Sequence, residues 1–239
     1  MTDDLFRLWV YLAATPLLGL TLTFVAYQLG LWLAHLAGGH PLVNPVLIAM
    51  VAIGSLLAAT GTPYRQYFEG AQFVHFLLGT ATVALAVPFF DRLAALRKRA
   101  LALSAGLVAG SVITLGLVVL LMGGLGARET TLLSMVPKSV TAPIAMGISE
   151  AIGGIPTLSA VFCVTTGVIG AATGKLVFDA IGVRDLAIRG FALGVQAHGI
   201  GTARAFYVSP EAGAYAGLAL GLNGIVSALL LPVLTSLLR

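Results

Sequence analysis

The sequence has 239 residues, of which 59% are hydrophobic and only 9% are charged, and its mean hydropathy is +1.02. Soluble globular domains carry roughly 25% charged residues, so this composition excludes a soluble domain and predicts an integral membrane protein. The formal net charge of +4 does not indicate nucleic acid as a partner, because the basic residues lie in short stretches between apolar runs, as membrane topology requires.

Six apolar segments are expected to span the bilayer, because a spanning helix needs about 20 mainly apolar residues. The first two lie in a stretch without formal charge between Arg7 and Arg65. In chain order the six segments are 9–35, 44–60, 71–90, 100–122, 157–174 and 212–238. The second and fifth are short for a span, so we expect them to need help from neighbouring segments or a thin bilayer.

Two further apolar segments, 132–155 and 190–206, contain prolines or glycines that interrupt a helix. Non-helical backbone at membrane depth persists only where protein or a water-filled cavity surrounds it. We therefore expect an all-α, polytopic membrane protein with a single domain over 1–239. It would have about six full transmembrane helices plus two broken or re-entrant segments, which makes eight membrane-embedded elements.

Positive charge predicts the topology of these elements. The loop Asp91–Arg99 and the loop 175–189 are both rich in lysine and arginine, so both are expected in the cytoplasm. Segment 132–155 would then enter and leave from outside, and 190–206 from the cytoplasmic side. The alternative is that both cross fully, which gives eight spans and places 175–189 outside, against the charge rule.

A weak similarity between 79–86 and 138–145 suggests an inverted repeat of the kind found in secondary transporters. Chance similarity is the alternative in so alanine-rich a chain.

The first candidate site lies in segment 137–150, where Lys138 and Glu150 flank the hydroxyl residues Ser139 and Thr141. An ionisable group at membrane depth is costly and therefore indicates function. The alternative is that Lys138 extends to the interface and Glu150 caps a helix end.

The second candidate site lies in segment 197–205 and combines His198, Gly199, Gly201, Thr202 and Arg204. A helix start beside an arginine offers a small anion site, and imidazole titrates near neutral pH. The alternative is a histidine that is merely hydrogen-bonded between helices. A dinucleotide site is excluded, because the third glycine of GxGxxG is missing and no strand precedes the segment.

Three further residues, Thr82, Asn223 and Cys163, are polar or reactive residues within apolar runs. Thr82 and Asn223 are polar residues within spans, and they would either line a path or bond neighbouring helices. The single cysteine, Cys163, has apolar neighbours that predict a buried, inert thiol. Hydrolase motifs and metal-ligand spacings are missing from the sequence, so we expect neither an enzyme nor a bound metal or cofactor.

These motifs resemble the LrgB/CidB family of membrane proteins. The residues that carry the resemblance are Asn44-Pro45, 67–71, 76–79, 81–88, 137–141 and above all 198–205, and the match covers about residues 10–235. The resemblance implies two functions. Bacterial members are described as holin- or antiholin-like regulators of murein hydrolase export and autolysis, often beside a small LrgA/CidA-type membrane partner. Plastid relatives carry glycolate and glycerate, and some bacterial relatives are linked to pyruvate handling.

Charges within the membrane favour a carrier over a holin, because lesions made by massed simple helices need no such charges. We expect a secondary transporter of small monocarboxylates in the inner membrane, coupled to protons or cations and working by alternating access. It would assemble as a homo-oligomer, a dimer in the simplest case. The alternatives are a holin- or antiholin-like regulator and a scaffold for a partner membrane protein.

The expected substrate-binding residues are Lys138, Ser139, Thr141, His198, Gly199, Gly201, Thr202, Arg204, Thr82 and Asn223, with Glu150 or His198 as the proton-coupling group.

Overall fold

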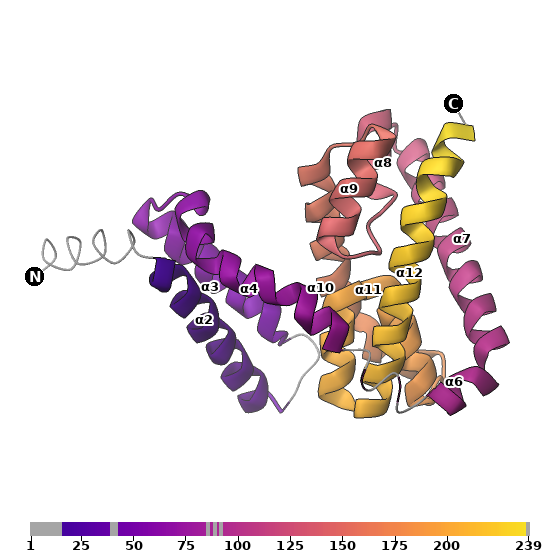
Figure 1. The fold of residues 1–239 in the computed structure, drawn as a ribbon, viewed down its shortest axis with the longest axis horizontal. Helices are drawn as coiled ribbons and strands as arrows, with labels where there is room; N and C mark the ends of the chain where they lie inside the picture. Colours follow the sequence, from indigo (N-terminus) through magenta and orange to yellow (C-terminus); the bar gives the residue numbers. More distant parts are fainter. Residues whose placement is uncertain (1–15, 39–42, 85–86, 88–89, 91–92, 238–239) are drawn as a thin grey trace, which may run out of the picture. The chain divides into compact units, whose positions relative to one another are not determined.

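The computed structural model describes residues 16–38, 43–84, 87, 90 and 93–237, and this part of the chain is built from α-helices (Figure 1). Residues 9–15 of the first expected span lie outside the described part. The chain divides into two compact units, Met1–Ala84 and Leu85–Arg239, and each is described by itself. The single domain expected from the sequence stays a prediction.

The first unit contains three helices, α2 (Pro16–Leu36), α3 (Pro45–Thr60) and α4 (Tyr64–Ala84). Asn44 explains where α3 begins, because its side chain accepts hydrogen bonds from the N–H groups of Val46 at 2.9 Å and Leu47 at 3.2 Å. Gly61, with φ of 64°, ends the helix. A helix over the second expected span is therefore confirmed, with 16 residues, and its crossing of the bilayer stays a prediction. The α4 helix begins at Tyr64, seven residues before the start of the third expected span.

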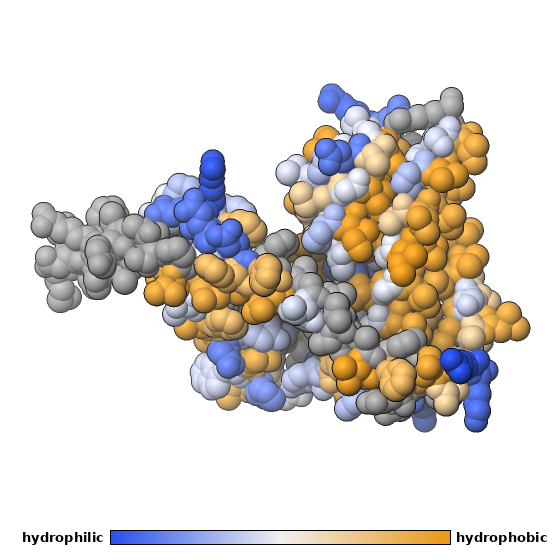
Figure 2. Space-filling view, in the orientation of Figure 1, coloured by the Kyte–Doolittle hydropathy of each residue, from blue (hydrophilic) through white to orange (hydrophobic). Residues whose placement is uncertain are grey.

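The second unit contains α6 (Leu93–Lys98), α7 (Ala100–Gly124), α8 (Glu129–Met135), α9 (Ala142–Ile152), α10 (Pro156–Ala180), α11 (Leu186–Val208) and α12 (Pro210–Leu237). Among the described residues, α2, α7, α10 and α12 are long and apolar enough to cross a membrane. Figure 2 shows that the visible face of α7 and α12 is mostly hydrophobic, with hydrophilic groups gathered at the two ends of this unit. These features confirm an all-α, polytopic membrane protein.

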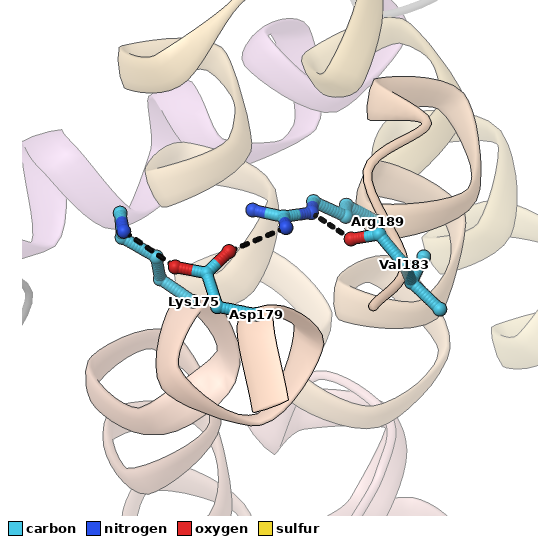
Figure 3. A network of polar contacts seen from close by, with 4 residues as sticks. All are labelled: Lys175, Asp179, Val183 and Arg189. Atoms are coloured by element: carbon cyan, nitrogen blue, oxygen red, sulfur yellow. Dashed lines mark hydrogen bonds and ion pairs between the residues drawn. The ribbon is translucent and has the colours of Figure 1, made fainter. Parts of the chain in front are cut away.

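The α10 helix corrects two expectations, because it has 25 residues and continues to Ala180. The fifth span is therefore not short, and the basic loop expected over 175–189 is reduced to residues 181–185. Lys175 was interpreted as a loop residue, but it lies within α10 and pairs with Asp179, Nζ to Oδ2 at 2.6 Å. Arg189 of α11 pairs with the other carboxylate oxygen at 2.5 Å and donates to the Val183 carbonyl at 2.7 Å (Figure 3). Similarly, the expected loop 91–99 contains the short helix α6.

The first broken segment enters and leaves at one end of the unit. The N–H of Ile155, just before α10, donates to Ser134 Oγ in α8 at 2.7 Å, and Ser159 Oγ donates to the Ser134 carbonyl at 2.7 Å. Residues 136–141 therefore lead inward from α8, and α9 returns to the same end (Figure 1). At 1.5 Å per residue, the 11 residues of α9 cover about 16 Å, about half of a bilayer core.

The second broken segment also returns to its starting end. The helix breaks at His198, where φ is 41° and ψ is −130°, and we call its two arms α11a (186–197) and α11b (199–208). They fold back on each other, because Ala205 of α11b is buried against Leu193 of α11a. A Cβ on Gly190, near the start of α11a, would collide with the carbonyl of Ala212, four residues after α11b, so the two ends of α11 lie together. Both broken segments thus have the re-entrant form that was expected.

The two stretches that suggested a repeat have different backbones. Residues 79–84 continue the α4 helix, whereas 138–141 are a non-helical turn. The repeat-like arrangement in this structure is instead the pair of re-entrant segments.

Candidate functional site

The tips of the two re-entrant segments meet at Asn223 on α12, and this side chain is 3% exposed. Its amide nitrogen donates to the carbonyl of Ser139 in the first tip at 2.9 Å and to the carbonyl of Val195 in the second at 3.0 Å. Its amide oxygen accepts from Ser111 Oγ of α7 at 3.3 Å. One side chain therefore joins both tips and a spanning helix, which accounts for a polar residue inside an apolar span.

Cys163 on α10 makes a second connection between the same tips. Its thiol donates to the Val140 carbonyl at 2.7 Å, and its own carbonyl oxygen lies 2.9 Å from Nε2 of His198. The buried position expected for Cys163 is confirmed, since the residue has no exposed surface. The sequence did not indicate that it would connect the two broken segments.

His198 is held in a strained conformation at the second tip. Among the described residues it is the one non-glycine residue with positive φ, a region that costs about 1–3 kcal/mol. The ring is accommodated by Gly167 of α10, where a Cβ would lie 2.8 Å from Nε2. Thr202 Oγ1 donates to the His198 carbonyl at 2.8 Å. This geometry matches the alternative of a histidine bonded between helices, and its proton-coupling role stays a prediction.

A cavity of about 120 Å³ lies beside the first tip, between α7, α11a and α12. We call it the tip cavity, and by volume it accommodates several water molecules. Its polar lining residues are Ser111, Thr114, Ser139, Gln196, Asn223 and Ser227. Gln196 Nε2 donates to Thr114 Oγ1 at 2.5 Å, and Gln196 Oε1 lies 3.5 Å from Ser139 Oγ.

Positive charge and helix starts gather beside this cavity. Lys138 is half-buried next to the lining, with Nζ 3.4 Å from Ser139 Oγ. The first turn of α9 starts there, and its N-cap residue, Thr141, makes no side-chain capping bond. The α11b arm starts at the other tip. Because N-terminal N–H groups carry partial positive charge, two helix starts and a lysine favour an anion at this position.

Other expected site residues lie further from the tips. Arg204 is half-buried six residues beyond the break, about 9 Å along the helix axis, and its guanidinium lies 5.2 Å from the centre of the Tyr207 ring. Glu150 is exposed near the end of α9, about 12 Å along the axis from its start. Gly199 is half-buried, and Gly201 is buried against the Leu193 carbonyl.

Thr82 belongs to the first unit and lies within α4, but its side chain is outside the described part of the structure.

Sequence reasoning missed Gln196, Thr114 and Ser111. Their one signal was a polar side chain within an apolar run, which Asn223 also carried. Nothing in the sequence pairs Gln196 with Thr114, because 82 residues separate them.

The end of the unit opposite α8 carries a charged helix cap. Asp185 precedes α11, and its Oδ1 accepts from the N–H groups of Ile188 at 3.1 Å and Ala187 at 2.8 Å. The Arg99 guanidinium lies 3.3 Å from Oδ2. The N–H of Ile188, followed by that of Ala187 and the Arg99 charge, holds the pKa of Asp185 below its ordinary value.

Two broken segments, whose tips meet beside a mostly apolar cavity with a few polar lining residues, lie inside a set of apolar helices. This arrangement defines a polytopic membrane protein with paired re-entrant segments. The chain belongs to the LrgB-like family, whose model matches residues 23–237.

Three named relatives each match most of this chain at about 30% identity. The chain is 30% identical to the holin-like protein CidB of Staphylococcus epidermidis over 195 residues, which is 82% of this chain and 85% of that protein. It is 30% identical to the antiholin-like protein LrgB of Bacillus subtilis over 223 residues, 93% of this chain and 96% of that protein. It is 33% identical to YwbG of Bacillus subtilis over 193 residues, 81% of this chain and 86% of that protein. No solved structure matches the chain with significant similarity.

Proposed function

We propose that this protein is a secondary carrier of small monocarboxylates, of the glycolate, glycerate or pyruvate class, in the cytoplasmic membrane. The observation that carries the proposal is the meeting of the two re-entrant tips at Asn223, beside a cavity whose lining includes the polar side chains of Ser139, Gln196 and Asn223. Transporters place their substrate sites near the membrane midplane, where interrupted helices expose backbone groups.

The chemistry around the tips suits a carboxylate. Lys138 supplies a full positive charge, and the starts of α9 and α11b supply partial positive charge. The Ser139 hydroxyl and the amides of Gln196 and Asn223 supply groups that can orient a small hydroxy or keto acid. Alternating access then requires the tips and α7 to separate and rejoin around the bound anion.

A second candidate function is favoured by the names of the relatives. CidB of Staphylococcus epidermidis is called holin-like and LrgB of Bacillus subtilis is called antiholin-like, and neither name describes an enzyme. These names support a regulator of murein hydrolase activity and autolysis better than they support a carrier. A small LrgA/CidA-like membrane partner belongs to this candidate as a prediction, whereas the homodimer is a prediction for either candidate.

Transport by the purified protein separates the two candidates. The protein is reconstituted alone into liposomes, and uptake of labelled glycolate, glycerate and pyruvate is measured together with release of a large trapped dye. A carrier gives saturable uptake of one labelled acid, which an excess of the same unlabelled acid inhibits, and it releases no dye. A holin-like protein gives dye release or no selective uptake, and either result would reject the carrier.

A lysine variant tests the site within the same assay. Lys138→Ala removes the charge beside the tips and is expected to reduce carboxylate uptake at least tenfold. Lys175→Ala is the matched control, because that lysine pairs with Asp179 at a helix end. Equal uptake by both variants would remove Lys138 from the substrate site, while leaving transport itself established.

A further inference from the structure

A second and larger cavity lies along α7, on the other side of Gln196 from the tip cavity. It has a volume of about 590 Å³ and extends from Arg99 and Asp185 at one end of the unit to Val195 and Gln196. We call it the α7 vestibule. Glycines of α7, Gly106 and Gly110, form part of its wall, and they leave space where side chains would otherwise stand.

The vestibule and the tip cavity share two lining residues, Val195 and Gln196. From Gln196 the tip cavity continues past Ser227 to Leu234, toward the opposite end of α12. The two cavities together therefore follow α7 through most of the unit, and of the two residues that they share only Gln196 has a polar side chain.

The amide of Gln196 forms the polar boundary between these cavities. Its nitrogen donates to Thr114 Oγ1 of α7 at 2.5 Å, and its oxygen lies 3.5 Å from Ser139 Oγ of the first tip. The bond thus ties α11a to α7 at the level where one cavity ends and the other begins. Elsewhere along this face, Gly106 and Gly110 line the vestibule, and Ser111 lines the tip cavity.

We propose that the Gln196–Thr114 hydrogen bond is the gate between two halves of a substrate path that runs along α7. The inference rests on the proposed carrier function and adds the path and the residues that close it. A carboxylate is a stronger acceptor than a hydroxyl, so an arriving anion can take the Gln196 amide hydrogens from Thr114. The substrate would therefore open the gate itself, and a neutral solute of the same size would not.

Variants of the gate test this directly in liposomes that contain the purified protein. Thr114→Val keeps the shape of the side chain but removes the acceptor, and it is expected to raise passive flux of small neutral solutes at least fivefold. Gln196→Glu places a negative charge at the boundary and is expected to lower carboxylate uptake at least tenfold. Thr173→Val on α10 is the matched control, since its hydroxyl donates within its own helix, to the Ile169 carbonyl at 2.8 Å.

Thiol labelling tests the path without any need for transport. Ala192→Cys places a thiol in the vestibule and Ser227→Cys places one in the tip cavity. The unaltered protein serves as the blank, because the thiol of Cys163 is fully buried. A charged, membrane-impermeant maleimide is added to sealed vesicles of either orientation. Ala192→Cys should react only from the side of Arg99 and Asp185, and Ser227→Cys only from the other side.

The outcomes separate this inference from the proposed function. If the unaltered protein moves no carboxylate, the carrier function fails, whatever the gate variants do. If it transports but both gate variants behave like Thr173→Val, the gate is wrong. Reaction of both thiols from one side would show that both cavities open to the same side and would overturn the path. Reaction only with membrane-permeant reagents would show that the cavities hold lipid and would overturn it as well.

Discussion

The amide nitrogen of Asn223 lies 2.9 Å from the carbonyl oxygen of Ser139, although 84 residues separate the two in sequence. The same nitrogen also donates a hydrogen bond to the carbonyl of Val195 at 3.0 Å, so one side chain holds both re-entrant tips. In apolar surroundings the loss of such a bond costs more free energy than in water, because no water molecule can replace the lost donor to the backbone carbonyl.

Replacement of Asn223 is expected to destabilise the second unit. Hydrogen bonds within membrane proteins contribute about 0.6 kcal/mol on average and up to about 1.7 kcal/mol, so Asn223→Ala should cost about 1–3 kcal/mol. Asn223→Asp, which keeps the shape but removes both donors, should cost at least as much. Thermal unfolding in detergent measures the effect, with Ser227→Ala, in the same cavity lining, as control. A midpoint for Asn223→Ala equal to that of the control would contradict the role given to this amide.

The space for the His198 ring depends on Gly167. A Cβ at residue 167 would lie 2.7 Å from Cε1 of the ring, so Gly167→Ala should displace His198 and cost about 1–3 kcal/mol. Adding His198→Ala removes the clash, and the double variant should lose less stability than the sum of the two single variants. Gly147→Ala is the control, because a Cβ at that residue meets nothing within 4 Å. Strictly additive losses would show that the ring and the glycine do not compete for space.

Close approach of α11a and α12 depends on Gly194. A Cβ at this residue would collide with the backbone carbonyl of Ala216, which no side-chain rotation can relieve. Gly194→Ala should therefore force the helices apart, lower the unfolding midpoint and increase the fraction of aggregated protein on size-exclusion chromatography. Gly221→Ala in α12 should be neutral or stabilising, since its Cβ enters open space and alanine favours a helix. Equal behaviour of the two variants would argue against this helix contact.

Asp185 gives the stability of the protein a defined pH dependence. Its native pKa is lowered, chiefly by the N–H groups of Ile188 and Ala187, so it stabilises the folded protein above its unfolded pKa of about 3.9. That stabilisation is lost as the pH falls through the still lower native pKa. Asp185→Ala should cost about 1 kcal/mol at neutral pH, as other N-cap replacements do. Asp185→Asn should retain most of the capping and lose this pH dependence, which unfolding midpoints between pH 7 and pH 3 would reveal.

The sequence predicted the re-entrant segments because their breaks are local. Pro137 and Pro143 exclude a continuous helix over the first, and the glycines around His198 weaken the second. The parity of crossings, taken from positive charge, then predicted that both return to their starting ends, and the contacts Ser134–Ile155 and Gly190–Ala212 agree.

The parts that could not be predicted depend on long-range pairing. The bond between Gln196 and Thr114 has no local signal, because each is a single polar residue within an apolar helix. The full length of α10 was missed because Lys175 and Asp179 looked like loop residues. In the structure these charges neutralise each other one helical turn apart, so the helix can continue through them.

The dependence of both tips on α12 also has a consequence for biogenesis. A ribosome releases residues 136–141 long before Asn223, so the Ser139 carbonyl of the first tip lacks its final donor while the chain is being inserted. The interior can therefore close only after synthesis is nearly complete. Chains truncated before residue 223 should stay open in the membrane and become substrates for proteolytic quality control.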